Sequence, residues 1–384
     1  MADNKDKKVL NVPHLRFPEF SGEWEKCKLG DIATGFDYGM NAAAKPFDGE
    51  NKYIRITDID EASSTYIDKD IVSPDGTLTE NYLVNDRDIL LARTGASTGK
   101  SYLYRKSDGK LYYAGFLIRA NVTKHNPYFV FSQLHTHRYW SWVSIMSARS
   151  GQPGINSQEY SSFPVYVTSL REEEKISALL SLIDERIATQ NKIIEDLKLL
   201  KSAIAETVFN NMKGHLTTNL STICNIVKGK QVNGEELSGK GKYYVMNGGI
   251  TPSGYYDQCN TPDNTISISE GGNSCGYVQY NKSSFWSGGH CYTLQDICSG
   301  VEPQYLFHYL KRYESNIMKL RIGTGLPNIQ KKDLENFRIE LPPSNVQKEI
   351  ATCLTAIEHK ILVEINWLDS VQKEKKHLLR QMFI

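Results

Sequence analysis

The chain has 384 residues, 40% hydrophobic and 23% charged, and its 45 basic and 44 acidic side chains give a formal net charge of +1. This length allows two or three domains, each with its own core. A near-neutral charge excludes a general electrostatic attraction to nucleic acid, so any DNA-binding function must rest on local groups of basic and amide side chains.

The cysteines and the N-terminus place further limits on the class of protein. The seven cysteines are scattered and form no CxxC pair, which argues against a zinc site and a disulfide framework. The first residues, MADNKDKK, are polar, and no apolar run reaches membrane length. We therefore expect a soluble cytoplasmic protein with free thiols and no metal site.

The first part of the chain has the pattern of an α+β domain. Residues 1–23 are expected to form a polar tail and a proline-punctuated segment draped over the domain that follows. Short β-branched and aromatic runs predict strands at KYIRITDI (52–59), DILLART (88–94), SYLYR (101–105) and GFLIRANV (115–122). A helix over 129–146 is expected to pack on this sheet, followed by the loop SGQPGIN and a strand at FPVYV.

The pattern then changes to that of a long helix. Residues 172–211 contain no proline or glycine, and apolar residues recur in steps of three and four from Ile176 to Val208. This heptad pattern is typical of a coiled coil. Ser169 and Glu172 form a candidate capping box at its start. At 1.5 Å per residue, the helix should be ~60 Å long.

The same plan occurs twice. Residues 150–210 align with residues 324–384 at a constant offset of 174, without a gap. A second strand-rich region (216–294), a helix near 303–320, a strand at FRIEL and a final helix starting near Ser344 repeat the first half. The expected domains are a tail at 1–23, two similar α+β domains at 24–170 and 214–343, and long helices at 171–213 and 344–384.

These elements predict an α+β fold with two similar domains, each a small mixed β-sheet with a packed helix. The two long helices should separate them as an antiparallel coiled coil with pseudo-two-fold symmetry. Polar residues interrupt both helical seams at the same two steps, Gln190 with Glu364 and Lys201 with Lys375. They either fix the register, with Gln190 and Glu364 meeting near the midpoint, or lie at the solvent edge of the seam.

One motif resembles a phosphate-binding loop. GASTGKS (95–101) has three residues between its glycines, whereas that loop needs four and should open a helix. Since SYLYR reads as a strand, a tight hairpin tip is the favoured interpretation, and nucleotide binding is kept as an alternative. Such a tip can approach a DNA backbone closely. No set of residues typical of catalysis stands out, so we expect no catalytic residues and no bound cofactor in this chain.

Recognition is then the function that the polar side chains favour. Basic, amide and hydroxyl residues cluster at predicted tips and loop edges in both halves. The candidates for DNA contact are Arg55, Arg93, Thr94, Ser97, Thr98, Lys100, Arg149, Ser150, Gln152, Lys228, Lys230, Asn247, Asn273, Lys319, Arg321 and Thr324. Arg149 and Arg321 occupy equivalent places, at the end of the packed helix of each half.

Several sequence stretches together resemble the specificity (S) subunit of a type I restriction-modification system, and the resemblance extends over nearly the whole chain. The resemblance is carried by WEKCKLGDIATG (24–35), YIRITDID (53–60), LLARTGASTGKSYLY (90–104), YAGFLIR (113–119) and SGQPGIN (150–156), and later by LPNIQKKDLENFRIELPP and VQKEIATCL (346–354). The second half is more divergent, because SISEGGNSCGYVQY replaces RTGASTGK. The order of domain, long helix, domain, long helix is the most specific feature.

The resemblance implies a non-catalytic, sequence-specific DNA-recognition subunit whose two target recognition domains each read half of a bipartite double-stranded target. It implies that two DNA adenine methyltransferase (modification) subunits and restriction/translocase subunits are the partners. S-adenosylmethionine, ATP and Mg²⁺ are then expected in those partners and not in this chain. A coiled-coil scaffold without a nucleic-acid role and a nucleotide-binding protein are the alternatives.

Overall fold

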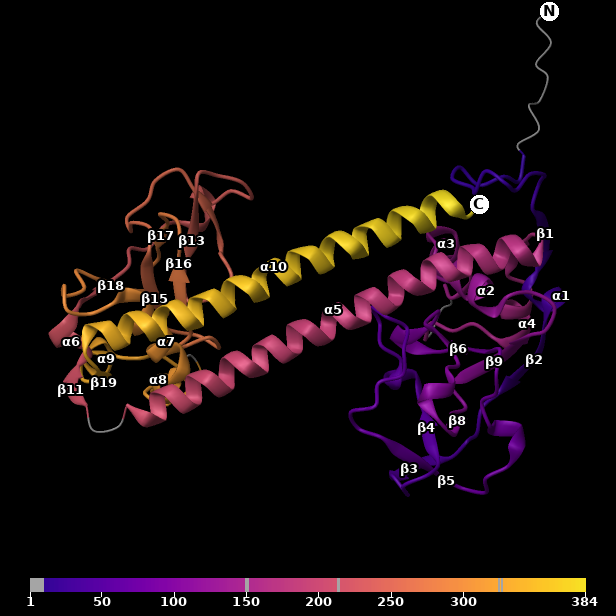
Figure 1. The fold of residues 1–384 in the computed structure, drawn as a ribbon, viewed down its shortest axis with the longest axis horizontal. Helices are drawn as coiled ribbons and strands as arrows, with labels where there is room; N and C mark the ends of the chain where they lie inside the picture. Colours follow the sequence, from indigo (N-terminus) through magenta and orange to yellow (C-terminus); the bar gives the residue numbers. More distant parts are fainter. Residues whose placement is uncertain (1–9, 149–151, 213–214, 324, 326) are drawn as a thin grey trace, which may run out of the picture. The chain divides into compact units, whose positions relative to one another are not determined.

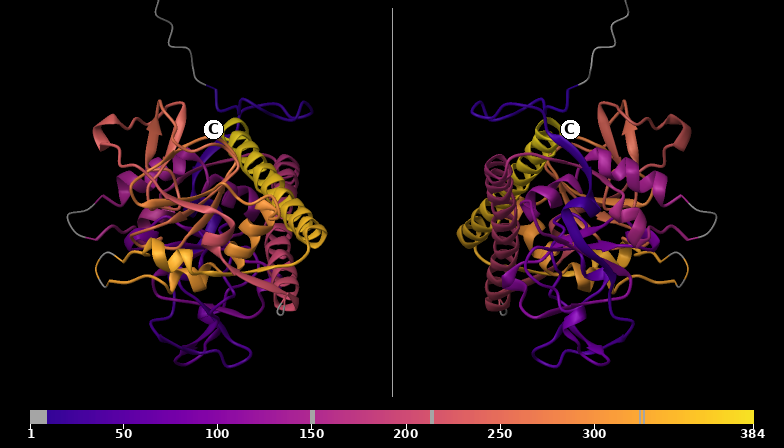
Figure 2. Two further views of the ribbon diagram at one scale, coloured as in Figure 1. Left: turned by 90° about the vertical axis from the view of Figure 1, so that its left-hand side faces the viewer. Right: turned by 90° about the vertical axis from the view of Figure 1, so that its right-hand side faces the viewer.

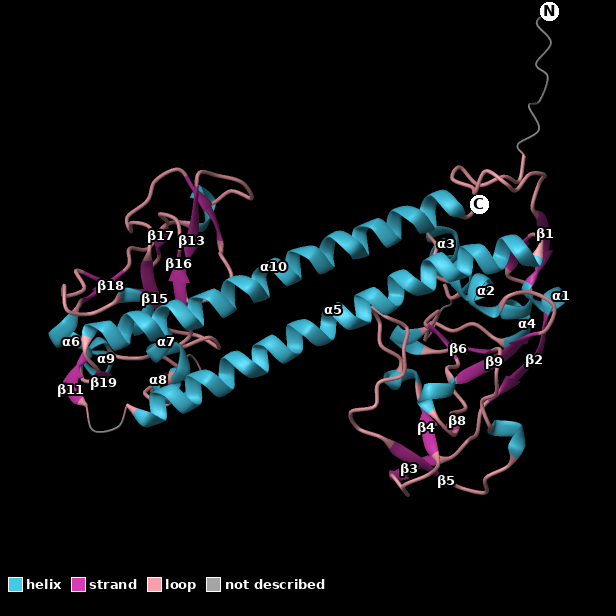
Figure 3. Ribbon diagram, viewed as in Figure 1, coloured by secondary structure: helices cyan, strands magenta, loops and turns pink. Residues whose placement is uncertain are grey.

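The computed structural model describes residues 10–148, 152–212, 215–323, 325 and 327–384. It divides into two compact units, shown in Figure 1 along the sequence and in Figure 3 by secondary structure. Unit 1 contains the chain up to Gln190 together with Trp367–Ile384, and unit 2 contains Asn191–Asn366. The division crosses both long helices. Each unit therefore combines one α+β domain with the start of one long helix and the end of the other.

A four-stranded antiparallel sheet in the order β2-β9-β6-β7 is the centre of unit 1. Three strand pairs surround it: β1–β10 and β3–β5 are antiparallel, and β4–β8 is parallel. The strands are β1 (Glu25–Lys28), β2 (Ala33–Tyr38), β3 (Ala43–Pro46), β4 (Lys52–Ile54), β5 (Val72–Asp75), β6 (Asp88–Ala92), β7 (Ser101–Leu103), β8 (Leu111–Tyr113), β9 (Leu117–Val122) and β10 (Pro164–Val167). The predicted strands are present but shorter than expected.

The helices of unit 1 pack on this sheet through a core that includes Ile89, Ile118 and Tyr139. They are α1 (Leu29–Ile32), α2 (Pro127–Gln133), α3 (His137–Met146), α4 (Ser157–Ser161) and the first half of α5 (Leu170–Asn211). The single helix expected over 129–146 is wrong, because two helices occupy this stretch. Thr136 starts the second one, with its hydroxyl accepting from the Tyr139 N–H and donating to the Gln133 carbonyl.

Unit 2 repeats the topology of unit 1. Its central sheet is antiparallel in the order β12-β18-β15-β16, with β11–β19 paired beside it and β14-β13-β17 as a third sheet. The strands are β11 (Leu216–Asn219), β12 (Asn225–Lys228), β13 (Tyr243–Met246), β14 (Gly254–Tyr256), β15 (Thr265–Ser269), β16 (Val278–Asn281), β17 (Trp286–Ser287), β18 (Cys291–Gln295) and β19 (Arg338–Leu341). As with β4–β8, the β13–β17 pair is parallel.

The helices of unit 2 are α6 (Leu220–Ile223), α7 (Pro303–Arg312), α8 (Glu314–Met318), α9 (Lys331–Glu335) and most of α10 (Ser344–Met382). The continuous helix expected near 303–320 is also wrong. Tyr313 leaves helical geometry, with φ −98° and ψ 19°, and separates α7 from α8. Both halves therefore break the packed helix into two pieces at the corresponding place.

Inside each unit, α5 and α10 pair antiparallel, as the heptad pattern predicts. In unit 1, Asp184 forms an ion pair with Lys375, and Arg186 lies 4.7 Å from the centre of the Trp367 ring. In unit 2, Lys201 forms an ion pair with Glu358 at 2.8 Å. Both seam lysines thus pair across the two helices.

The other polar position of the seam, Gln190 with Glu364, lies at the boundary between the two units. Gln190 is buried in unit 1, whereas Glu364 belongs to unit 2 and forms an ion pair with Lys360 one turn away. The expected meeting of Gln190 and Glu364 stays a prediction.

The start of α5 is tied to its domain by the buried carboxylates of Glu172 and Glu173. Glu172 accepts from Arg16, Thr168 and the Trp24 ring N–H, so its carboxylate does not complete the expected capping box. The other half of the box is present, because the Glu172 N–H donates to the Ser169 hydroxyl at 3.4 Å. Residues 10–23 drape over unit 1 as predicted, next to the end of α10, where the Leu15 N–H donates to the Gln381 carbonyl at 2.8 Å (Figure 2). Residues 1–9 lie outside the described part of the chain.

Candidate nucleic-acid interface

The GASTGKS stretch is a hairpin turn between β6 and β7. A 3₁₀ turn over Gly95–Ser97 joins the antiparallel strands, and Gly95 and Gly99 have φ of 68° and 93°, where a side chain would be strained. A strand follows the turn, whereas a phosphate-binding loop would require a helix. The geometry therefore favours the hairpin-tip interpretation over nucleotide binding.

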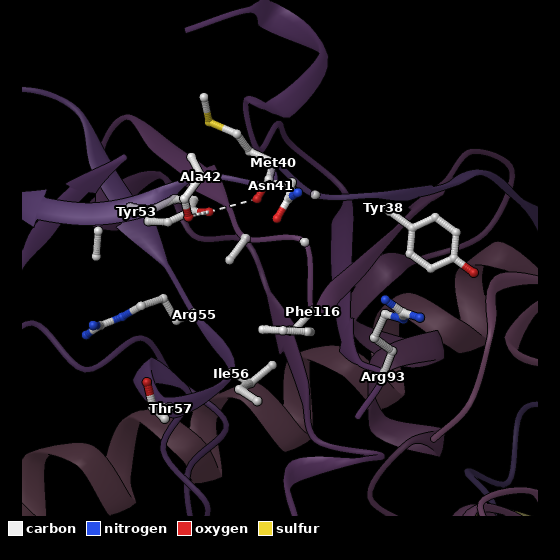
Figure 4. Close-up of a pocket in the computed structure, with 14 residues that line it drawn as sticks. Tyr38, Met40, Asn41, Ala42, Tyr53, Arg55, Ile56, Thr57, Arg93 and Phe116 are labelled. Carbon is white, nitrogen blue, oxygen red and sulfur yellow. Dashed lines mark hydrogen bonds between the residues drawn. The ribbon is translucent and has the colours of Figure 1, made fainter. Parts of the chain in front are cut away.

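A pocket of about 620 Å³ opens beside this hairpin in unit 1. Figure 4 shows Arg93 with its guanidinium near the Tyr38 ring, Phe116 between the two arginines of the pocket, and Arg55 on the opposite side. Phe116 is 57% exposed and Tyr38 is 41% exposed. Exposed aromatic rings beside a cation are the side chains that contact bases in nucleic-acid complexes.

Arg93 is held by an aromatic ring instead of a carboxylate. Its guanidinium carbon lies 4.6 Å from the centre of the Tyr38 ring, a cation–π distance. Its Nε is buried without a hydrogen-bond partner among the described residues. The Ser157 N–H donates to the Tyr38 hydroxyl at 3.3 Å. Hydrogen bonding by Ser157, through its side chain first and then its backbone N–H, lowers the pKa of Tyr38, and the nearby Arg93 charge acts in the same direction.

Two further predicted cations of unit 1 lie in the described part of the chain, and both are already paired. Arg55 is held by both oxygens of Asp58, at 2.7 and 2.8 Å, although it still lines the pocket. Lys100 lies 3.4 Å from Glu61, an exposed carboxylate that contributes little attraction in water. Among the predicted cations of this unit that the structure describes, Arg93 is therefore the one with no carboxylate partner.

The polar residues predicted at the hairpin tip divide into structural and exposed ones. Thr98 is buried and its hydroxyl donates to the Gly95 carbonyl at 2.8 Å, so it holds the turn. Thr94 bridges to Gly154, and Gln152 is exposed next to Gly95. Ser97 closes the turn. Arg149 and Ser150 lie outside the described residues.

In unit 2 the predicted residues surround a buried carboxylate that sequence reasoning missed. Lys228 forms an ion pair with Glu270 at 2.6 Å, and the His290 ring lies 3.7 Å from the other carboxylate oxygen. Tyr292 donates to the same Glu270 oxygen as Lys228, at 3.0 Å. Burial, followed by the charge of Glu270, raises the pKa of Tyr292.

The remaining predicted residues of unit 2 are spread around this carboxylate. Asn247 accepts from the His290 backbone N–H at 3.0 Å and so belongs to the same cluster. Lys230, Asn273, Lys319 and Arg321 are exposed, the last two directly after α8 as expected. Thr324 lies outside the described residues.

Four residues of these clusters were not predicted from the sequence: Tyr38, Phe116, Glu270 and His290. Phe116 and His290 are separated by 174 residues, the offset of the internal repeat. Extending the repeat upstream at that offset would have found this pair, because both lie immediately before the strand that pairs with the hairpin strand.

A metal site and a membrane-spanning helix each place requirements on the described residues. In the part of the chain that the structure describes, no group of three or more His, Cys, Asp or Glu side chains could hold a metal ion. The same residues include no helix long and apolar enough to cross a membrane.

Comparison with known protein families matches both halves. The family described as "Type I restriction modification DNA specificity domain" matches residues 21–199 and again residues 213–370. A putative type I specificity subunit of Mycoplasma genitalium is 33% identical over 165 residues, covering 41% of this chain and 43% of that protein. A similar putative subunit of Mycoplasma pneumoniae is 34% identical over 154 residues. The chain spans about two fifths of the length of these two relatives.

Longer matches cover almost the whole chain. A putative type I restriction enzyme specificity subunit of Methanocaldococcus jannaschii is 24% identical over 97% of this chain and 95% of its own length. The crystal structure of an S subunit from M. genitalium superimposes with a TM-score of 0.71 and 18% identity, and the match covers 97% of this chain and 99% of that one. A chain from a study of type I complex assembly gives a TM-score of 0.54 at 17% identity, with coverage of 94% and 97%. The two structural matches support the fold.

Proposed function

Because the chain belongs to the family of type I restriction-modification specificity subunits, we propose that it reads a bipartite double-stranded DNA target, one half-site per unit. Adenine methylation and restriction would be carried out by modification and restriction/translocase subunits that it directs. S-adenosylmethionine, ATP and Mg²⁺ would be bound by those partners. The chain itself would then be non-catalytic.

The observation that supports this proposal most directly is the duplicated hairpin with exposed side chains around it. Each unit presents a cation beside the hairpin that follows β6 or β15, with Arg93 on Tyr38 in the first and Lys228 on Glu270 in the second. Cations and planar rings at a tight turn are suited to phosphates and base edges. Two such sites favour a target with two halves.

A near-neutral chain is compatible with this function if partner subunits supply part of the phosphate neutralisation. Purified chain combined with its modification subunits should bind a duplex carrying the target more tightly than a scrambled duplex. The logarithm of the binding constant should fall linearly with the logarithm of the salt concentration. Equal affinity for both duplexes at every salt concentration would contradict sequence-specific reading.

The scaffold alternative makes a different prediction for the same assembly. If the coiled coil only holds partners together, reversing the charges of Arg93 and Lys228 should leave DNA binding by the complex unchanged. If the units read DNA, these reversals should weaken target binding while the subunits still co-elute. The two outcomes separate a reader from a scaffold without any assumption about the target sequence.

A further inference from the structure

The two hairpins share one backbone frame. In unit 1, Arg93 donates its N–H to the Phe116 carbonyl and accepts from the Ile155 N–H. In unit 2, the backbone N–H of Glu270 donates to the His290 carbonyl, and the backbone carbonyl of Glu270 accepts from the Ile329 N–H. The turn bonds also match: Gly95 and Gly272 donate to Pro153 and Pro327, and Gly99 and Gly276 donate to Ala92 and Ser269. Arg93 and Glu270 therefore occupy the same place in the fold.

The neighbouring strand supplies a third matched position. The backbone N–H of Gly39 donates to the Leu117 carbonyl, and that of Gly229 donates to the Cys291 carbonyl, one residue after Tyr38 and Lys228 respectively. Tyr38 pairs with Ile118 in the sheet register, and Lys228 pairs with Tyr292, the residue 174 positions later. Tyr38, Arg93 and Phe116 thus correspond to Lys228, Glu270 and His290, and we refer to each set as a reading triad.

The chemistry of the triad is exchanged between the units. In unit 1 the central residue is a cation that stacks on the Tyr38 ring, with Phe116 lining the same pocket, and in unit 2 it is an anion flanked by Lys228 and His290. In unit 1 the cation directly follows β6. In unit 2 it is the last residue of β12, the position that corresponds to the end of β2. Backbone geometry is kept, while the location of the hydrogen-bond donor changes.

On the basis of the proposed function, we propose that the triads determine sequence specificity, with Arg93 reading a guanine in one half-site and Lys228 reading a guanine in the other. Glu270 is a positioning residue that holds Lys228. Because the two cations occupy different triad positions, the guanines lie at different steps of their half-sites.

Arg93 fits a base-reading role better than a structural one. No described carboxylate forms an ion pair with it, and the Tyr38 ring orients the guanidinium without consuming its terminal donors. A planar guanidinium donates two parallel hydrogen bonds to the O6 and N7 acceptors of guanine. Phe116, exposed on the same rim, offers an apolar contact for a neighbouring base.

Glu270 cannot act in the same way, because it is only 8% exposed. Its Oε2 is buried and, among the described residues, has no hydrogen-bond partner, with the His290 nitrogen at 3.7 Å. Its Oε1 takes the ammonium of Lys228 at 2.6 Å, while the Lys228 side chain remains 53% exposed. A buried carboxylate that fixes one donor of an exposed lysine leaves the other donors for a base edge.

The test for unit 1 is selection of binding sequences from randomised duplexes by the complex of this chain with its modification subunits. R93M should remove the guanine preference at one step of one half-site, by about tenfold to hundredfold, and leave the other half-site unchanged. R93K keeps the charge but not the paired donors, so it should lose most of that preference with the salt slope retained. A uniform loss over all sequences with a salt slope reduced by about one would overturn the assignment and make Arg93 a phosphate contact.

For unit 2, K228M and E270Q should both relax the single step of the other half-site that Lys228 reads. The double variant should relax it no further than K228M alone, because Glu270 acts through the lysine. An E270Q effect at a different step, or no effect on the selected sequence with a lower melting temperature only, would contradict the positioning role.

The selection also separates this inference from the proposed function. If the unaltered complex enriches no sequence, the proposed function fails. If it enriches a bipartite sequence that R93M, K228M and E270Q leave unchanged, the triads are wrong and the proposed function stands.

Discussion

The two units tether their long helices at the same place, with one hydrogen bond in common and another reversed in direction. At the start of α5, the buried carboxylate of Glu173 accepts from the N–H groups of Asn126 and Thr168, at 2.9 and 3.1 Å. At the start of α10, the Gln347 oxygen accepts from the Glu302 N–H at 2.9 Å, while its amide donates to the Pro342 carbonyl at 2.8 Å.

The difference between Glu173 and Gln347 matches the groups that face them, which are the His125 ring and the Thr168 N–H in unit 1 and two carbonyls in unit 2. Proline has no N–H, so at Pro342 the chain presents only an acceptor where Thr168 presents a donor. A carboxylate suits the donor and an amide suits the acceptor. The comparison shows that both units keep the same architecture and differ in local polar contacts. This holds for Glu173 and Gln347, which we call the anchor residues, and for the reading triads.

Exchanging the anchor residues should have the largest effect on the unfolding free energy, because each side chain would then face the wrong backbone groups. Q347E buries a carboxylate against the carbonyls of Pro342 and Gly300, and we expect unit 2 to lose about 3–5 kcal/mol of unfolding free energy at neutral pH. E173Q leaves the Thr168 N–H facing an amide donor and should cost unit 1 about 1–3 kcal/mol. Denaturant unfolding followed by fluorescence measures both.

Acidification provides a control for Q347E. Protonating the introduced carboxyl restores a donor toward the Pro342 carbonyl, so lowering the pH should recover part of the lost stability. E173Q introduces no new carboxyl, so the unfolding free energy of that variant should not rise on acidification. A Q347E variant that is as stable as the unaltered chain at neutral pH would contradict the account of the anchor.

Replacing two equivalent glycines of the hairpins by alanine should have an intermediate effect on the unfolding free energy. Both have positive φ, 93° at Gly99 and 91° at Gly276, so alanine is strained at either position. A Cβ at Gly276 would lie 2.9 Å from backbone atoms of Met318, whereas one at Gly99 would meet the Val143 side chain at 2.7 Å. Because a side chain can move and backbone cannot easily do so, G276A should cost about 2–4 kcal/mol and G99A about 1–3 kcal/mol.

Thermal unfolding of the two alanine variants tests this order. The loss should be larger for G276A, and the hairpin of the other unit serves as the internal control in each case. Equal melting temperatures for G99A and G276A would show that the contact with Met318 relaxes as readily as the contact with Val143.

The seam ion pairs should give the smallest effect. Lys375 pairs with Asp184, which also accepts from the Tyr128 hydroxyl, whereas Lys201 pairs with the more exposed Glu358. Since part-exposed pairs contribute little, K375M and K201M should each lower the unfolding free energy by about 0.5–1 kcal/mol. High salt should reduce both differences, and a salt-independent loss of several kcal/mol would contradict this estimate.

Much of the fold could be predicted from the sequence because its signals are local. The apolar period of α5 and α10 and the repeat at offset 174 are properties of contiguous stretches. The breaks between α2 and α3 and between α7 and α8 were missed, because a single capping threonine and one residue outside helical geometry cause them within otherwise helical patterns.

The reading triads lay beyond sequence reasoning for a different reason. Their equivalent members are separated by 190, 177 and 174 residues, since loops of different length lie between the strands. No single offset aligns them, and their side chains differ in charge. Backbone hydrogen bonds between strands distant in the sequence bring them together, so only the structure shows that Arg93 and Glu270 are counterparts.

The most direct test of the central claim is a map of methylated adenines in DNA from cells that carry this chain with its modification subunits. The account predicts a bipartite motif, and replacing residues 24–148 with the corresponding domain of another specificity subunit should change one half of it and preserve the other. A motif that changes in both halves, or an undivided motif, would contradict one half-site per unit.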